Sequence, residues 1–180
     1  MPSNGAPGYP RFVPAPPQGG LPIYDFGPLL AQGAPPWWFL GCHGGAGTST
    51  LHAAVPGGMD GGHWWPVCAP PTPVRVVLVT RSHAHGLRAA QTAAWQWTQS
   101  SHLRAVHLVG LAVIADAPGR RPKPLRDLLG LISGGVPKVW DLPWVEALRL
   151  GDPPGEISLP AQYAALAADL HNIMTGGRNA

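Results

Sequence analysis

The sequence predicts an α/β domain in which helices cover both faces of a mostly parallel sheet. Residues 74–80 and 106–115 are apolar, β-branched runs with the length of strands that are buried on both faces. Residues 84–100, which lie between them, form a predicted helix whose apolar side chains repeat at helical spacing: Leu87, Ala90, Ala94 and Trp97. Strands that alternate with helices in this way are typical of a three-layer α/β domain.

The remaining expected elements continue this alternation. A first strand is expected over residues 37–42, followed by a glycine-rich loop and a short helix over 50–55 that ends at Pro56. Residues 56–73 are rich in Gly, Pro and Trp, and we expect them to be irregular. The last elements are expected as follows: a helix over 125–132, a strand over 136–142, and a C-terminal helix with Tyr163, Leu166, Leu170 and Ile173 on one face.

Residues 1–36 differ in composition from the rest of the chain. They contain ten prolines and six glycines, and Arg11 and Asp25 are their charged residues. Such a segment has too little apolar surface to fold by itself, so we expect a disordered tail ahead of one domain over residues 37–180. Within the tail, residues 21–26 offer an apolar stretch that can dock on the domain or on a partner, although a solvated linker is the expected state.

Bulk properties favour a soluble, cytoplasmic protein. The formal net charge is +3, and no apolar run approaches the roughly 18 residues of a membrane-spanning helix. The densest basic cluster, Arg120-Arg121-Pro122-Lys123, leaves nucleic-acid binding open, but solvated loop cations are the usual case.

The most informative motif follows the first expected strand. Residues 43–50 read His-Gly-Gly-Ala-Gly-Thr-Ser-Thr. A strand that leads into a glycine-dense turn and then into a helix is how a phosphate-binding loop begins, because glycines let backbone N–H groups approach an anion closely. The lysine that normally precedes the Ser/Thr pair in such a loop is replaced here by Thr48.

This loop resembles the phosphate loop of ParA/MinD-type ATPases, whose pattern is Lys-Gly-Gly-x-Gly-Lys-(Thr/Ser)-Thr. It also resembles that of an actinobacterial family of uncharacterised function with the loop HGGAGTST. The ParA/MinD resemblance implies a P-loop NTPase-like domain that binds ATP or ADP with Mg²⁺, with Ser49 as a ligand of the metal. It implies a nucleotide site made of these residues: His43, Gly44, Gly45, Ala46, Gly47, Thr48, Ser49, Thr50 and Asp116.

Both lysines of the family pattern are absent, since His43 and Thr48 occupy their positions. Loss of one charge-assisted contact weakens phosphate binding by about one to two decades. Hydrolysis depends on cations that meet the charge of the transition state, so we expect at most a weak ATPase, with a regulatory or pseudo-ATPase role.

Two acids are candidates for the Mg²⁺-linked aspartate. No apolar strand precedes Asp60, so we expect it to be a poor candidate. Asp116 ends a buried strand, but the chain order places it nearer the base than the metal. An Asx turn at Pro118-Gly119 is its structural alternative.

Other functions remain open from the sequence. The main alternative is a non-catalytic interaction module that uses the N-terminal tail or the Trp-rich segments, for which Trp64 and Trp65 are expected to be exposed together. A zinc site has donors without the usual spacing: Cys42, His43, His63, Cys68, His83 and His85. A nucleophilic enzyme is disfavoured because no Gly-x-Ser-x-Gly elbow is present.

Overall fold

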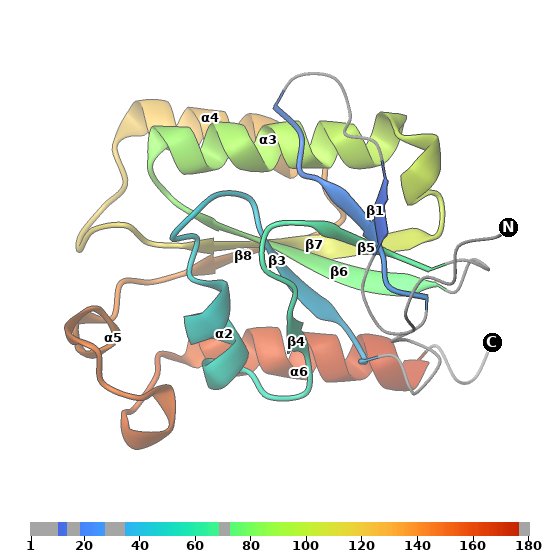
Figure 1. Cartoon of the computed structure of the whole chain (residues 1–180). Helices are drawn as coiled ribbons and strands as arrows, with labels where there is room; N and C mark the ends of the chain where they lie inside the picture. Colours follow the sequence, from blue (N-terminus) through green and yellow to red (C-terminus); the bar gives the residue numbers. More distant parts are fainter. Residues whose placement is uncertain (1–10, 14–18, 28–34, 69–72, 177–180) are drawn as a thin grey trace, which may run out of the picture.

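The computed structural model of the chain describes residues 11–13, 19–27, 35–68 and 73–176. Its centre is a five-stranded sheet in the order β4-β3-β6-β7-β8, in which all neighbouring strands are parallel (Figure 1). The strands are β3 (Trp38–Gly41), β4 (Met59–Asp60), β6 (Val74–Arg81), β7 (Val106–Ile114) and β8 (Val139–Leu142). The prediction of a mixed α/β domain with a mostly parallel sheet is therefore confirmed.

Helices cover both faces of this sheet (Figure 1). One face carries α3 (Ala84–Gln99) and α4 (Lys123–Ser133), and the other carries α2 (Thr48–Ala54) and α6 (Ala161–Gly176). Shorter elements complete this part of the chain: α5 (Glu146–Leu150) and the 3₁₀ helices η1 (Ser101–Leu103) and η2 (Pro154–Glu156). The predicted strands and long helices are confirmed, with ends that differ by a few residues.

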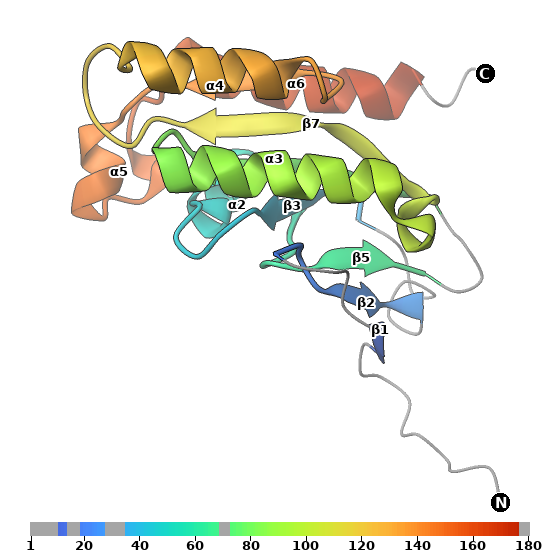
Figure 2. The same cartoon turned by 90° about the horizontal axis from the view of Figure 1, so that it is seen from above.

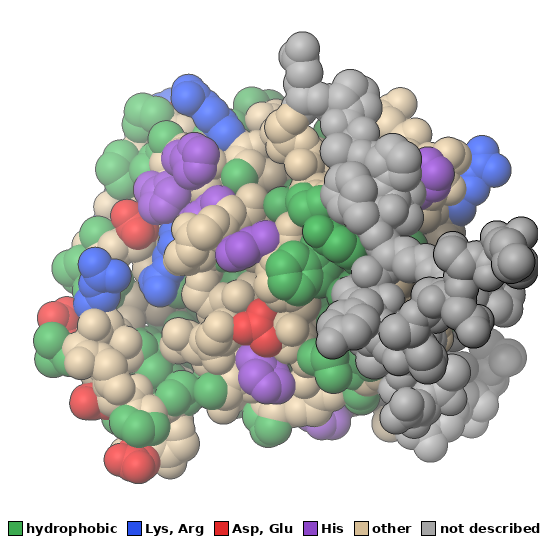
Figure 3. Space-filling view, viewed as in Figure 1, with side chains coloured by type: hydrophobic (Ala, Val, Ile, Leu, Met, Phe, Trp, Pro, Cys, Tyr) green, Lys and Arg blue, Asp and Glu red, His purple; other side chains and the backbone are tan. Residues whose placement is uncertain are grey.

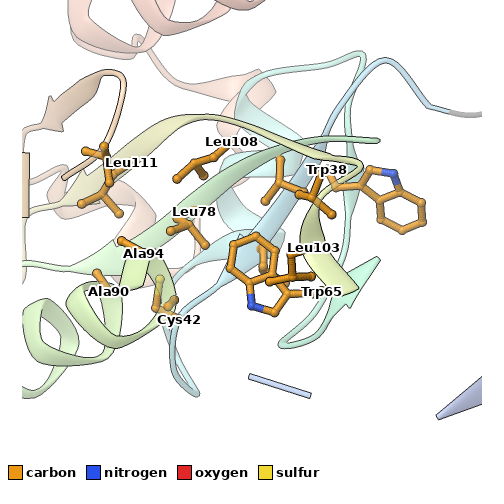
Figure 4. Packing of buried hydrophobic residues seen from close by; sticks show 14 of the residues in the cluster. Trp38, Cys42, Trp65, Leu78, Ala90, Ala94, Leu103, Leu108 and Leu111 are labelled. Carbon is orange, nitrogen blue, oxygen red and sulfur yellow. The ribbon is translucent and has the colours of Figure 1, made fainter. Parts of the chain in front are cut away.

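Alternate residues of the central strands fill two separate apolar layers. Leu78 of β6 packs with Leu87 of α3 on one side, whereas Val77 and Val79 pack with the α2 and α6 side chains on the other. Figure 4 shows the first layer, in which Leu78 and Leu111 face Ala90 and Ala94 of α3. Burial on both faces explains why the strands read as continuous apolar runs rather than as alternating ones.

A second, three-stranded sheet lies beside the first and joins segments that are far apart in the sequence (Figure 2). Its strands are β1 (Arg11–Val13), β2 (Ile23–Asp25) and β5 (Trp65–Val67), with β2 antiparallel to β1 and parallel to β5. The expectation that residues 56–73 are irregular is therefore wrong for β4 and β5. Strands of two or three residues are too short to produce a readable hydropathy pattern.

The segment 21–26 packs against the domain, so the prediction of a disordered tail does not hold there. Ile23 and Phe26 are buried in the same apolar cluster as Trp65. Gln96 of α3 fixes the segment, because its side chain accepts from Leu21 N–H at 2.8 Å and donates to Leu21 O at 2.7 Å. The apolar stretch was visible in the sequence, but its partner strand β5 was not. Residues 1–10, 14–18 and 28–34 lie outside the described residues.

No helix in the described parts of the chain is long and apolar enough to cross a membrane.

Candidate phosphate-binding site

The loop after β3 makes a tight turn that depends on two glycines. Gly45 and Gly47 have φ values of 75° and 95°, a region that favours glycine. A Cβ on Gly47 would also lie 2.9 Å from the Cδ1 atom of Ile114. Gly47 is the N-cap of α2, and the Leu51 N–H donates to its carbonyl oxygen at 2.9 Å. Two of the three glycines predicted to shape the loop, Gly45 and Gly47, therefore lie where the backbone favours glycine, whereas Gly44 does not.

Ser49, in the first turn of α2, contacts an acid from the neighbouring strand. Its Oγ donates a hydrogen bond to Asp60 Oδ2 at 2.7 Å, and Asp60 Oδ1 accepts from Gly62 N–H at 2.9 Å. Asp60 ends β4, which pairs with β3 through Trp38↔Met59 and Phe39↔Asp60. Asp60 is thus the second residue of a two-residue strand, and it is this strand pairing, not a preceding apolar strand, that brings it to Ser49.

Asp116 lies elsewhere on the same edge of the sheet. It follows β7, which is separated from β3 by β6, and its backbone N–H donates to Ser82 Oγ at 3.0 Å. Its side chain borders a groove of about 960 Å³ beyond the end of β7. Ser49 and Asp116 are therefore not brought together, whereas Ser49 and Asp60 are.

His43 connects the loop after β3 to the loop after β6. Its Nε2 atom accepts from Arg81 N–H at 3.2 Å, and its Nδ1 atom lies 2.8 Å from Gly44 O and donates to it in the matching tautomer. Desolvation lowers the pKa of His43 below its ordinary value of 6.5, and charge on the neighbouring histidines lowers it further. A neutral imidazole at this position does not replace the charge of a lysine.

Three imidazoles cluster at this point of the molecule. The ring centroid of His43 lies 5.1 Å from that of His83 and 5.9 Å from that of His85. His83 also caps α3, because its Nδ1 atom accepts from Gly86 N–H at 2.9 Å. Figure 3 shows His side chains gathered over the start of α3. Within the described residues, no group of three or more His, Cys, Asp or Glu side chains is arranged to hold a metal ion.

Arg81 supplies a cation beside the loop that sequence reasoning did not place there. It ends β6, and its Nη1 donates to Ala115 O at 3.2 Å. Its Nη2 lies 3.4 Å from the position of a Cβ built on Gly47. The guanidinium borders a pocket of about 100 Å³ together with Thr50 and Tyr163. The available signal was that carboxyl ends of adjacent parallel strands meet at one edge of a sheet.

The strand order places these residues at a topological switch point. From β3 the chain first adds β4 on one side, and later adds β6 on the other side. Ligands of open parallel sheets bind in the crevice outside the carboxyl ends of the strands at such a point. The loop after β3 and the residues Arg81 and His83 lie on its two sides.

The geometry gives less support to the other predicted sites. Burial raises the pKa of Cys42 to about 12, so this thiol is not a ready nucleophile. In the basic cluster, Arg121 pairs with Asp141 and Lys123 pairs with Asp127, which reduces its net positive charge. Trp65 is fully buried while Trp64 is 38% exposed, so the two side chains are not exposed together.

Comparison with known proteins identifies the family. Residues 36–161 match the model described as "Family of unknown function (DUF6668)", and this range includes the loop, Asp60 and Arg81. The match covers more than half of the chain, so the protein belongs to this family. No curated protein matches the chain.

Proposed function

We propose that this protein is a P-loop-like nucleotide-binding protein that holds the phosphates of ATP or ADP, with Mg²⁺, at the loop between β3 and α2. The observation that carries the proposal is the 2.7 Å hydrogen bond from Ser49 Oγ to Asp60 Oδ2. In P-loop NTPases, Mg²⁺ is held by the loop Ser/Thr and an aspartate at the end of a neighbouring strand. The same pairing of residue types occurs here, with Ser49 on the helix that follows β3 and Asp60 on the adjacent parallel strand β4.

The donor set fits the metal. Mg²⁺ prefers oxygen ligands and retains several of its waters, so one hydroxyl and one carboxylate beside a phosphate are a sufficient protein contribution. Ser49 is exposed and Asp60 is half-buried, so both remain accessible from solvent. A bound Mg²⁺ supplies positive charge to the phosphate oxygens. The protein's part is to present Ser49 and Asp60 and to orient the backbone amides of the loop.

The proposal is for binding rather than for efficient hydrolysis. Neither position 43 nor position 48 carries a lysine, and the imidazole of His43 uses both ring nitrogens in bonds to backbone groups. Rapid phosphoryl transfer needs cations placed around the transferring group and a positioned water. A regulatory nucleotide sensor or a pseudo-ATPase fits these residues better than a fast ATPase.

Calorimetric titration with Mg·ADP and Mg·ATP tests this function. We expect binding that weakens when Mg²⁺ is removed by EDTA and that weakens about 10-fold or more in Ser49→Ala, because a metal ligand is lost. Ser101→Ala, an exposed serine of η1, is the matched control and retains binding. Absence of binding up to several millimolar nucleotide, or equal binding by wild type and Ser49→Ala, contradicts the proposal.

A further inference from the structure

Within the part of the chain that the structure describes, the half-buried guanidinium of Arg81 has no carboxylate partner. Among the described residues, the ion pairs are Arg121–Asp141, Lys123–Asp127 and Lys138–Asp169, and none includes Arg81. Within the described residues, its one side-chain hydrogen bond runs from Nη1 to Ala115 O. Arginine has five N–H donors, and burying a charge without a partner is costly. The remaining donors therefore favour an anion.

Among the described residues that line the pocket beside Arg81, none carries a negative charge. The polar and charged lining residues of this pocket are Thr50, Arg81, Arg149 and Tyr163, and the other lining residues are apolar. Burial raises the pKa of Tyr163, although the charge of Arg81 acts in the opposite direction, so the phenol stays protonated at neutral pH. Arg149 adds a second positive charge. The lining is thus cationic and neutral, which suits an anionic ligand.

The guanidinium of Arg81 also lies beside the loop between β3 and α2, where the lysine is missing. Its Nη2 and Nε atoms are 3.4 Å and 3.6 Å from the Cβ position of Gly47, the residue that precedes the lysine-less Thr48. Its backbone is held in place by the bond from Arg81 N–H to His43 Nε2. An arginine can bind two phosphate oxygens at once through its planar fork of donors, which a single ammonium group does less well.

We propose that Arg81 takes the place of the missing lysine of the phosphate loop, and that its guanidinium binds the terminal phosphate oxygens of the nucleotide from the β6 side of the switch point. This inference rests on the proposed function. In the ParA/MinD-type pattern the cation is a lysine of the loop itself, whereas Arg81 lies at the end of β6. The assignment of Arg81 accounts for the presence of a complete glycine loop in a chain that lacks the lysine at position 48.

Calorimetric titration of the full chain with Mg·ADP, using charge-changing and charge-keeping variants, tests this assignment. Arg81→Gln is expected to weaken binding by about 10- to 100-fold, the effect of a lost charge-assisted contact. Arg81→Lys keeps the charge but not the fork, and is expected to retain a larger part of the affinity. Arg88→Gln, an exposed cation on α3, is the control and leaves binding within about 2-fold, because surface charges are screened.

The outcomes separate the two proposals. If Ser49→Ala weakens binding but Arg81→Gln does not, the assignment of Arg81 is wrong and the proposed function stands. If Arg81→Lys and Arg81→Gln weaken binding equally, Arg81 acts only by fixing the end of β6 to Ala115, and the assignment is again wrong. If the wild-type protein binds no Mg·ADP, both proposals fall. Thermal unfolding of each variant identifies any loss that comes from the fold.

Discussion

The imidazole of His43 is held in its neutral form by its surroundings. Desolvation lowers its pKa from the ordinary value of 6.5, and positive charge on His83, His85 and His63 lowers it further. Protonation would also remove the lone pair that accepts the Arg81 N–H. Because folding lowers this pKa, the unfolded chain binds the proton first as the pH falls. The contribution of neutral His43 to the free energy of unfolding is therefore complete above about pH 6.5, and it is lost as the pH falls through the folded-state pKa of His43.

We therefore predict that the free energy of unfolding falls below pH 6.5 and that His43→Gln, which cannot titrate, reduces this pH dependence. Urea unfolding at several pH values between 5 and 8 measures it. His107→Gln, at an exposed histidine of β7, is the control. Equal pH dependence in wild type and His43→Gln would show that another group is responsible.

The glycines of the loop between β3 and α2 differ in whether the structure leaves room for a side chain. A Cβ on Gly47 would add a close contact with Ile114 to an unfavourable positive φ, whereas a Cβ on Gly44 meets nothing within 4 Å and no positive φ occurs there. We predict that Gly47→Ala lowers the free energy of unfolding by about 1–3 kcal/mol and that Gly44→Ala changes it by about 0.5 kcal/mol or less. Chemical denaturation of the pair measures both. Similar losses would mean that the turn does not need glycine at position 47.

Sequence reasoning identified the loop but not its complete set of partners. Gly45, Gly47 and Ser49 were predicted to belong to one site because the motif that resembles a phosphate loop is local in the sequence. Asp60 and Arg81 were not assigned to it because their proximity depends on strand order, which a single sequence reveals poorly. The acid in contact with Ser49 belongs to a strand of only two residues, and hydropathy periodicity cannot identify a strand that short.

At the level of elements, the strand β2 is held to the domain by one buried glutamine. Gln96 is 4% exposed, exchanges two hydrogen bonds with the backbone of Leu21, and accepts from Trp65 Nε1 at 3.0 Å. The β2 and β5 strands also pair directly, with Ile23 opposite Trp65. A segment that looked like a linker in composition is thus fixed by polar contacts that only the folded domain provides.

We predict that Gln96→Leu lowers the free energy of unfolding by about 2–4 kcal/mol, because it leaves buried backbone and indole groups without partners. It should also speed hydrogen exchange of the amides in residues 21–27. Gln91→Leu, at an exposed position of the same helix, is the control. An unchanged exchange rate in residues 21–27 would show that strand pairing alone holds the segment.

Long elements were predictable for a simple physical reason. The strands β6 and β7 are buried on both faces, so they appear as uninterrupted apolar runs, and α3 appears as a stripe at helical spacing. In contrast, β2, β4 and β5 each have two or three residues and depend on neighbours from distant parts of the chain. Such strands are set by tertiary pairing more than by local sequence.

At the scale of the whole molecule, the parallel sheet brings separate loops to one edge. The loop of residues 43–50, Asp60, and the pair Arg81 and His83 come from three separate places in the sequence, yet all lie at or beside the carboxyl ends of β3, β4 and β6. The α/β architecture thus explains why these residues meet at one edge of the sheet. It does not by itself identify the ligand, which depends on the residues at that edge.

Nuclear magnetic resonance of the ¹⁵N-labelled chain, titrated with Mg·ADP, tests nucleotide binding at this edge most directly. We predict that the backbone amides of residues 44–50 shift together with those of Asp60 and Arg81, that the shifts saturate, and that EDTA reverses most of them. Amides at the opposite end of the sheet, such as those of η1, should not move. Unchanged amides in residues 44–50 at several millimolar Mg·ADP, or saturable shifts confined to another region, would contradict binding at the β3–α2 loop.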